Sequence, residues 1–123
     1  MSPTGFKITR EEIQHNDKSV TVFHLFGWVD AQSEEKIFST AEVSYSQQGS
    51  RYLIINLEDV QMLTSAGIRV LQRIYRLYHS TETIGLKICS APAQVYHALT
   101  LTGFLQTVPM YENLQAALIA YDL

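Results

Sequence analysis

LIINLEDVQMLTSAGIRVL, residues 53–71, is the stretch that decides the fold, because its hydrophobic pattern changes half-way along. The first five residues are mostly branched and apolar and are followed by Glu58 and Asp59, which is typical of a strand buried on both faces. From Gly67 onward, apolar side chains recur at helical spacing, at positions 67, 70, 71, 74, 77 and 78. The stretch therefore predicts a buried strand, an acidic turn and an amphipathic helix that begins near Ser65.

The rest of the chain alternates predicted strands and helices. Asn16 and Asp17 favour a turn, so the two strands on either side are expected to form a hairpin. Strands of this length that alternate with helices predict an α/β domain, with a mostly parallel mixed sheet of four to five strands and about four helices. The further strands are expected at 6–9, 20–26, 86–89 and 108–111, and the further helices at 31–46, 92–103 and 114–121.

Length and composition fit one domain, 1–123, and exclude several functions. With 46% hydrophobic residues, the chain is long enough to form a core without disulfides or metals. The formal net charge of -3 argues against nucleic acid as a partner. No apolar run approaches the length of a membrane span or a signal peptide, and the single cysteine, Cys89, cannot form an internal disulfide. We expect a cytoplasmic protein with no membrane association.

The sequence offers no convincing catalytic, metal or cofactor site. The four histidines show no paired ligand spacing, and none neighbours the cysteine. A hydrolase with Ser65 as its nucleophile requires glycine two residues earlier, where this chain has Leu63. We therefore predict no enzymatic activity, no metal and no cofactor.

Ser65 has two interpretations from its position alone. Near a helix start, a serine hydroxyl can cap free backbone N–H groups. The same hydroxyl can carry a phosphate, which the positive end of the helix dipole favours. Position alone favours the cap, and Asp30, before the predicted helix at 31–46, is likewise interpreted as a helix cap.

Three segments of the sequence resemble the anti-sigma factor antagonists of the STAS domain family. The segment 56–68 resembles the family's strand end, acidic turn and Asp-Ser-Ser-Gly-Leu helix start, with Ser65, Gly67 and Ile68 at the phosphoacceptor, glycine and leucine positions. Residues 27–30 resemble the Gly-Glu-Leu-Asp entry to the first helix, and residues 101–104 resemble the glycine exit from the third. The family's aspartate before the acceptor is Thr64 here, and its second serine is Ala66.

This resemblance implies a partner-switching function in bacterial transcription regulation. In the family, the unphosphorylated domain binds an anti-sigma factor that is also a serine kinase of the histidine-kinase-like ATPase fold, and so frees a sigma factor. Phosphorylation ends that contact, and a metal-dependent serine phosphatase restores it. Carried onto this chain, the phosphoacceptor is Ser65, with Thr64 as the alternative acceptor or as the helix cap.

The partner surface is expected around the same helix start. Asp30 is associated with it through the family resemblance, and the acidic pair after the strand either steers a basic partner or only solvates a loop. Arg69 belongs to a stripe of three arginines that is either a solvated face or a docking surface. The predicted partner-binding residues are Asp30, Glu58, Asp59, Thr64, Ser65, Gly67, Ile68 and Arg69.

Two other functions remain open from the sequence. The first is a STAS scaffold that assembles without switching, and the second is a sensor of small ligands or nucleotides. No glycine-rich phosphate loop is present, which argues against the nucleotide sensor. For the oligomeric state we expect a monomer or a weak dimer.

Overall fold

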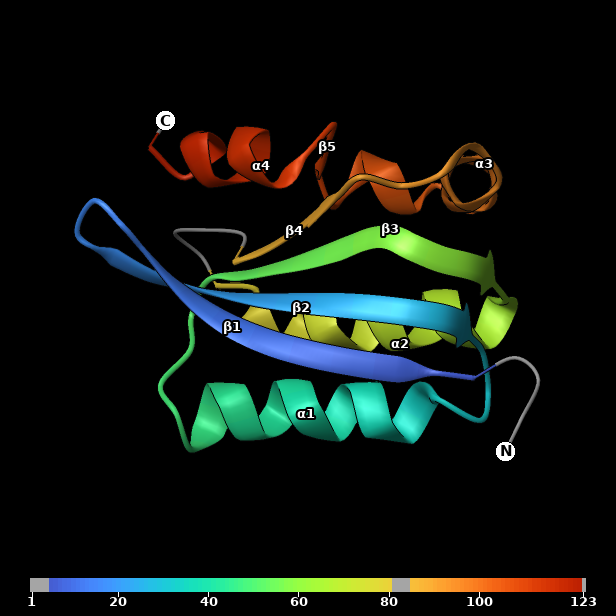
Figure 1. The fold of residues 1–123 in the computed structure, drawn as a ribbon, viewed down its shortest axis with the longest axis horizontal. Helices are drawn as coiled ribbons and strands as arrows, with labels where there is room; N and C mark the ends of the chain where they lie inside the picture. The colour runs from blue at the N-terminus through green and yellow to red at the C-terminus, as the bar shows by residue number, and fades with distance from the viewer. Residues whose placement is uncertain (1–4, 81–84, 123) are drawn as a thin grey trace.

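The computed structural model describes residues 5–80 and 85–122 and confirms the predicted α/β fold (Figure 1). Within these residues, one five-stranded sheet has the order β1-β2-β3-β4-β5, antiparallel between β1 and β2 and parallel elsewhere. The elements are β1 Lys7–His15, β2 Lys18–Val29, α1 Glu34–Ser46, β3 Leu53–Leu63, α2 Ser65–Tyr78, β4 Leu86–Cys89, α3 Ala93–Leu101, the 3-10 helix η1 Phe104–Gln106, β5 Met110–Tyr111 and α4 Leu114–Ala120.

The β1–β2 hairpin is longer than predicted and its turn is tighter. His15 pairs with Lys18, so only Asn16 and Asp17 form the loop. Asn16 has φ +57°, in the left-handed region that asparagine tolerates better than most residues. The turn chemistry predicted from the sequence is confirmed, although the strands extend directly up to the two turn residues on each side.

Strand β3 does not end at an acidic turn, so this part of the sequence interpretation is wrong. Glu58 and Asp59 lie inside β3, which continues to Leu63. The register between β2 and β3 shifts twice, and at each shift β3 carries one residue more than β2. Such bulges interrupt the alternation of apolar and polar side chains without ending the strand.

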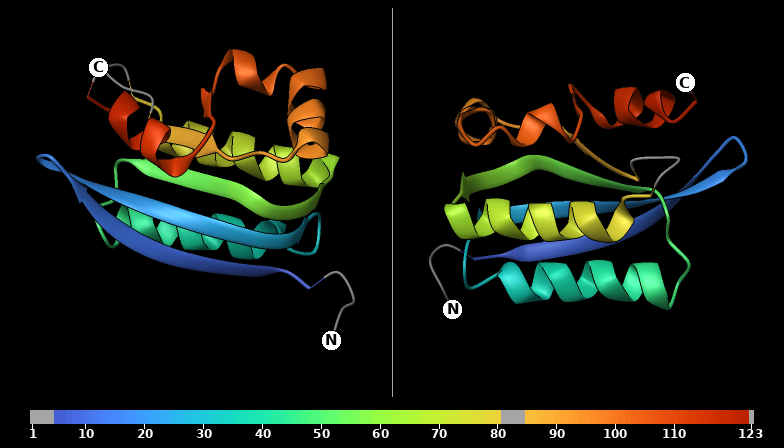
Figure 2. Two further views of the ribbon diagram at one scale, coloured as in Figure 1. Left: turned by 45° about the horizontal axis from the view of Figure 1, so that its top comes forward. Right: turned by 180° about the vertical axis from the view of Figure 1, so that it is seen from behind.

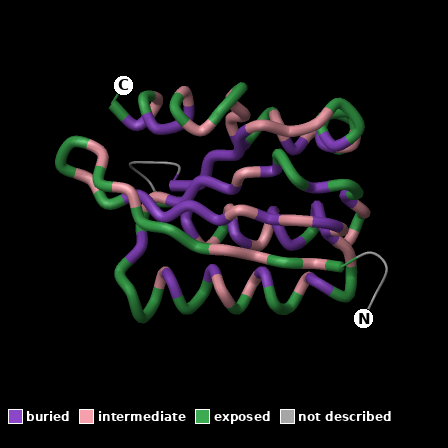
Figure 3. Tube along the Cα trace, in the orientation of Figure 1, coloured by how far each residue is buried: buried purple, intermediate pink, exposed green. Residues whose placement is uncertain are grey.

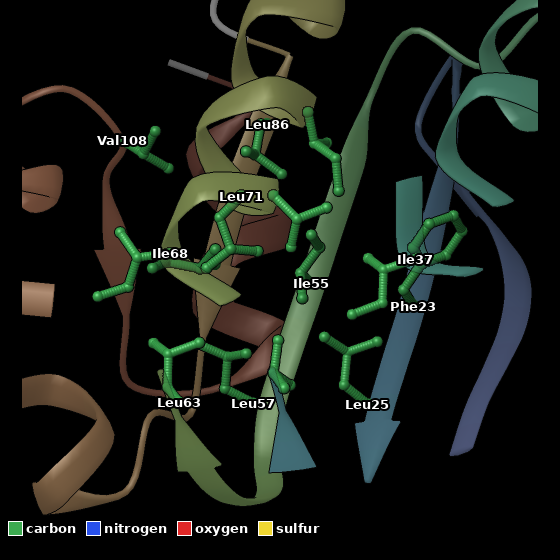
Figure 4. Close-up of a cluster of buried hydrophobic side chains, with 14 of the residues drawn as sticks. Phe23, Leu25, Ile37, Ile55, Leu57, Leu63, Ile68, Leu71, Leu86 and Val108 are labelled. Atoms are coloured by element: carbon green, nitrogen blue, oxygen red, sulfur yellow. The ribbon is translucent and has the colours of Figure 1, made fainter. Parts of the chain in front are cut away.

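Helices cover both faces of the sheet and enclose two cores. On one face, α1 and α2 lie side by side (Figure 2). Both helices contribute to the main core, and Figure 4 shows part of that core. On the other face, α4 packs over a smaller core that includes Cys89, which is fully buried. The trace in Figure 3 shows that burial concentrates in the central strands, whereas β1 at the edge is partly or fully exposed. The second core contains Val20, Val22, Ile54, Cys89, Ala117, Leu118 and Tyr121.

The C-terminal third follows the predicted order with shorter elements. Gly103 has φ +75° and ends the helical segment as predicted, after α3 itself stops at Leu101. Strand β5 was expected from residue 108. However, Val108 donates its amide to the Phe104 carbonyl, and Pro109 has no N–H and only accepts from the Ile88 N–H of β4, so the paired residues begin at Met110.

Candidate functional site at the starts of helices α1 and α2

Two helix starts meet at one end of the sheet. Because β2 and β3 are parallel, their last residues, Val29 and Leu63, are paired at the same end of the sheet, where the strands have their carboxyl ends. The chain leaves β2 toward α1 and β3 toward α2 at this end (Figure 1). The Thr64 backbone N–H donates to the Val29 carbonyl over 3.1 Å, which ties the start of α2 to the end of β2.

Thr64, rather than Ser65, is the N-cap of α2. Its backbone is extended, and its hydroxyl accepts a hydrogen bond from the Gly67 N–H over 3.3 Å. The capping interpretation of Ser65 is therefore wrong, and the alternative in which threonine caps the helix is confirmed. Ser65 becomes the first helical residue, and its side chain is exposed and has no hydrogen-bond partner among the described residues.

Gly67 allows the first turn of α2 to lie against the ends of both strands. A Cβ atom on this buried residue would lie 2.3 Å from the Val29 carbonyl oxygen and 2.7 Å from Leu63 Cδ1. Real Cβ atoms do not approach other atoms so closely, so only glycine fits here without movement of the backbone. The neighbouring Ile68 is 6% exposed and packs into the main core, where Figure 4 shows it with Leu63.

The start of α1 differs from the sequence prediction. The helix begins at Glu34, and its N-cap is Ser33, so the interpretation of Asp30 as the cap of a helix beginning at residue 31 is wrong. The Asp30 carboxylate instead accepts hydrogen bonds from the N–H groups of Gln32 and Ser33, over 3.0 and 3.2 Å. Asp30 therefore stabilises the turn that precedes the helix.

Ser33 is the residue of this site that the sequence interpretation missed. Its hydroxyl accepts from the Asp30 N–H over 2.9 Å and donates to the Trp28 carbonyl over 3.1 Å, and the residue is 3% exposed. A signal was available in the sequence, since a serine followed by Glu34 and Glu35 is a common pattern at helix starts.

A shallow hollow of about 530 Å³ separates the two helix starts. Asp30 contributes to one wall, and Ser65 and Arg69 contribute to the other. The structure thus brings four of the predicted partner-binding residues together, with the Ser65 hydroxyl accessible from solvent. The residues around the hollow are Asp30, Ala31, Gln32, Thr64, Ser65, Ala66 and Arg69.

Glu58 and Asp59 lie apart from this hollow. Both are exposed and lie at the first bulge of β3, and the Glu58 N–H donates to the Asn56 side chain over 3.0 Å. The remaining residues of β3, 60–63, separate this pair from the start of α2. The structure therefore does not place the acidic pair beside Ser65.

The arginines of α2 lie in two different environments. Arg69 and Arg73 face α1, where each lies 3.5 Å from the Glu34 carboxylate, and the Arg73 guanidinium stacks 3.9 Å from the centre of the Phe38 ring. Arg76 has no ion-pair partner among the described residues and faces a different cleft. Two of the three arginines therefore join the helices, and Arg69 stays largely exposed beside the hollow.

The side chains with shifted pKa values lie away from the hollow between the two helix starts. Burial raises the pKa of the Cys89 thiol and lowers the pKa of Lys87, both on β4.

Within the described ranges, no three His, Cys, Asp or Glu side chains are grouped so that they could hold a metal ion. No helix in this part of the chain is both long enough and apolar enough to cross a membrane.

The profile of the STAS domain family matches residues 11–117. The chain belongs to the STAS domain family. A sequence relative, the anti-sigma F factor antagonist of Paenibacillus polymyxa, is 21% identical over 102 residues, which cover 83% of this chain and 86% of that protein. This STAS domain thus shares its family with proteins named as anti-sigma factor antagonists.

Solved structures share the fold of this STAS domain. An anti-sigma factor antagonist from Mycobacterium paratuberculosis superposes with a TM-score of 0.83 at 23% identity, covering 99% of this chain and 98% of that one. The anti-sigma factor antagonist SpoIIAA in its unphosphorylated form gives 0.76 at 15% identity, covering 95% of this chain and 98% of that one. At these identities the likeness establishes the fold.

Proposed function

We propose that this STAS domain is a cytoplasmic anti-sigma factor antagonist that works by partner switching in bacterial transcription regulation. With Ser65 unmodified, it binds an anti-sigma factor that is also a serine kinase of the histidine-kinase-like ATPase fold. Phosphorylation of Ser65 ends that contact, and a metal-dependent serine phosphatase restores it. The family membership and the similarity to anti-sigma factor antagonists support this proposal.

The observation that carries the proposal is the free hydroxyl of Ser65. Thr64 performs the capping, so Ser65 is not needed to stabilise the helix start. Its side chain is exposed beside a hollow, where a kinase can reach it and where a docked partner would cover it. A serine in this position can change its charge without loss of a structural hydrogen bond.

The expected effect of the phosphate follows from electrostatics. A phosphate adds about -1.5 to -2 charges at neutral pH. The positive end of the α2 dipole and the exposed guanidinium of Arg69, one helical turn further on, stabilise that charge within the domain. A partner packed over the hollow has to desolvate the same charge, so the complex is destabilised while the fold is kept.

The proposed partner surface consists of side chains that solvent can reach around the hollow. Asp30, Thr64, Ser65 and Arg69 contribute directly. Gly67 and Ile68 are buried, so we assign them the role of holding the helix start in place. Glu58 and Asp59 extend the surface along β3 and contribute charge at longer range. The ion pair of Arg69 with α1 leaves its side chain available to a partner, because that side chain is 59% exposed.

Calorimetry with the cognate anti-sigma kinase tests this proposal. We expect Ser65→Ala to bind with an affinity close to that of the wild type and Ser65→Asp to bind more than ~100-fold more weakly, since about 3 kcal/mol of mismatch corresponds to that factor. Gln115→Asp is a matched control, because it places the same charge at an exposed position in the first turn of α4, on the other face of the sheet. Equal affinities for Ser65→Asp and the wild type would overturn the proposal.

Affinity capture from a lysate of the source cell identifies the partners. Baits with Ser65→Ala and Ser65→Asp are compared by mass spectrometry for their prey and, with the wild type, for the phosphorylated residue. We expect a kinase that is captured by the alanine bait and lost with the aspartate bait, and phosphate on Ser65 rather than on Thr64. Identical prey for both baits would favour the scaffold function instead.

A further inference from the structure

A second cavity lies between the second half of α2 and the segment around η1. Its volume is about 290 Å³, and Tyr75 and Arg76 line one wall while Phe104, Thr107 and Val108 line the other. Arg76 lies eleven residues beyond Ser65, which is about 16 Å along the helix. The cavity is therefore separate from the hollow at the helix starts, and an inference drawn from it goes beyond the proposed function.

The cavity combines an apolar floor with free polar groups. Phe104 is 5% exposed and presents a small apolar surface from within the core, whereas the lining residue Val108 is fully buried. The side chains of Gln72, Tyr75 and Thr107 have no hydrogen-bond partner among the described residues. This combination of an apolar surface and a few unused polar groups is typical of small-molecule sites.

Arg76 is the only charged residue among those that line the cavity, and its charge is not neutralised within the described part of the chain. Arg76 differs in this respect from the other two arginines of α2, because Arg69 and Arg73 are each paired with Glu34 on α1. No aspartate or glutamate belongs to the cavity lining, so the local field favours an anion.

We propose that this cavity binds a small organic oxyanion. The carboxylate or phosphate head of the ligand pairs with the Arg76 guanidinium, and a ring-sized apolar body lies between Phe104 and the ring of Tyr75. The volume lies at the lower end of the range of small-molecule pockets, about 300 to 1,000 Å³, which limits the ligand to roughly one ring with its anionic group.

A titration followed by NMR of the 15N-labelled protein tests this site. The probes are benzoate and phenyl phosphate, with benzyl alcohol as an uncharged analogue of the same size. We expect chemical-shift changes at the amides of residues 72–76 and 102–108 and a Kd of about 1 mM for at least one anion. Whichever anion has the lower Kd indicates whether the natural ligand carries a carboxylate or a phosphate. Benzyl alcohol is expected to bind at least ~10-fold more weakly than that anion.

Matched arginine variants make the assignment specific. Arg76→Gln is expected to weaken anion binding at least ~10-fold, whereas Arg73→Gln, which removes the same charge from the same helix, is expected to change it by less than ~2-fold. Amide shifts of β1 and β2, which neither arginine contacts, serve in the ligand-free variants as the check that the fold is retained. Shift changes absent from the cavity, equal binding of benzyl alcohol, or equal effects of the two variants would overturn the proposal.

Discussion

Ser33 and Ser65 stand at the starts of neighbouring helices, yet the structure uses them in opposite ways. Ser33 is 3% exposed, and its hydroxyl joins the Asp30 N–H to the Trp28 carbonyl. Ser65 is exposed, and its hydroxyl has no partner in the described residues because Thr64 already caps the helix. A serine near a helix start is therefore a structural residue in one case and a free chemical group in the other.

The comparison shows that capping and modification require different positions. A capping side chain precedes the helix and turns back toward the first N–H groups, so its oxygen is occupied. The first helical residue projects away from those groups, and the helix does not depend on its oxygen. The pair Thr64 and Ser65 separates the two tasks, whereas the Ser33 hydroxyl makes no cap hydrogen bond and instead fixes the turn before α1.

The largest effect is expected from Gly67→Ala, which moves the start of α2 away from the sheet. The new Cβ would lie 2.3 Å from a backbone oxygen, so the variant is expected to lower the free energy of unfolding by about 3 kcal/mol in urea titrations. Gly49→Ala is the control, because Gly49 has φ +73° and a Cβ added there would meet no atom within 4 Å, which leaves only backbone strain of about 1 kcal/mol. Equal losses for the two variants would contradict the role of crowding.

Ser33→Ala comes next and tests the difference between the two serines directly. The variant leaves the Asp30 N–H without its acceptor, so we expect the free energy of unfolding to fall by about 2 kcal/mol. Ser65→Ala removes no hydrogen bond and is expected to change this free energy by less than about 0.5 kcal/mol. Similar losses in chemical denaturation would remove the distinction between the two residues.

A smaller effect is expected from Thr64→Ala, which removes the cap of α2. The loss of one N-cap side chain corresponds to about 1 kcal/mol. Thr64→Ser retains both the capping oxygen and the hydroxyl that donates to the Val29 carbonyl over 3.3 Å, so its unfolding midpoint is expected to stay close to that of the wild type. If the alanine and serine variants unfolded at the same denaturant concentration, Thr64 would not act as the cap.

The smallest effect, and the only one of opposite sign, is expected from Ser65→Asp. A negative charge in the first turn of α2 interacts favourably with the helix dipole and with Arg69, so the free energy of unfolding is expected to rise by about 0.5 kcal/mol. The double variant with Arg69→Gln is expected to lose part of that gain. A clear destabilisation by Ser65→Asp would show that the helix start does not accommodate charge.

The sequence predicted the fold class and the place of Ser65 because both follow from strong periodic signals. The apolar run at 53–57 and the helical stripe from Gly67 leave few alternatives for a strand followed by a helix. The hairpin followed from Asn16 and Asp17, whose turn preference is local. Signals within one element, or between neighbours in sequence, were therefore sufficient for these predictions.

The errors arose where distant contacts decide the local structure. Glu58 and Asp59 remain in β3 because its pairing with β2 accommodates bulges, which an alternation pattern does not reveal. The Ser33 hydroxyl is hydrogen-bonded because the Trp28 carbonyl lies beside it, and the Ser65 hydroxyl is free because Thr64 caps the helix. The residue type serine specifies neither outcome. The cavity beside Arg76 requires α2 and η1 to be placed together, so sequence spacing did not indicate it.

The burial of Cys89 makes the wild-type chain suitable for site-specific spectroscopic labelling. This thiol is the only one in the sequence, it is fully buried between β4 and α4, and burial raises its pKa, which suppresses the reactive thiolate. A second cysteine introduced at an exposed position therefore reacts with a fluorophore or spin label while the native thiol is left unmodified. Distances across a complex become measurable without prior removal of the native cysteine from the core.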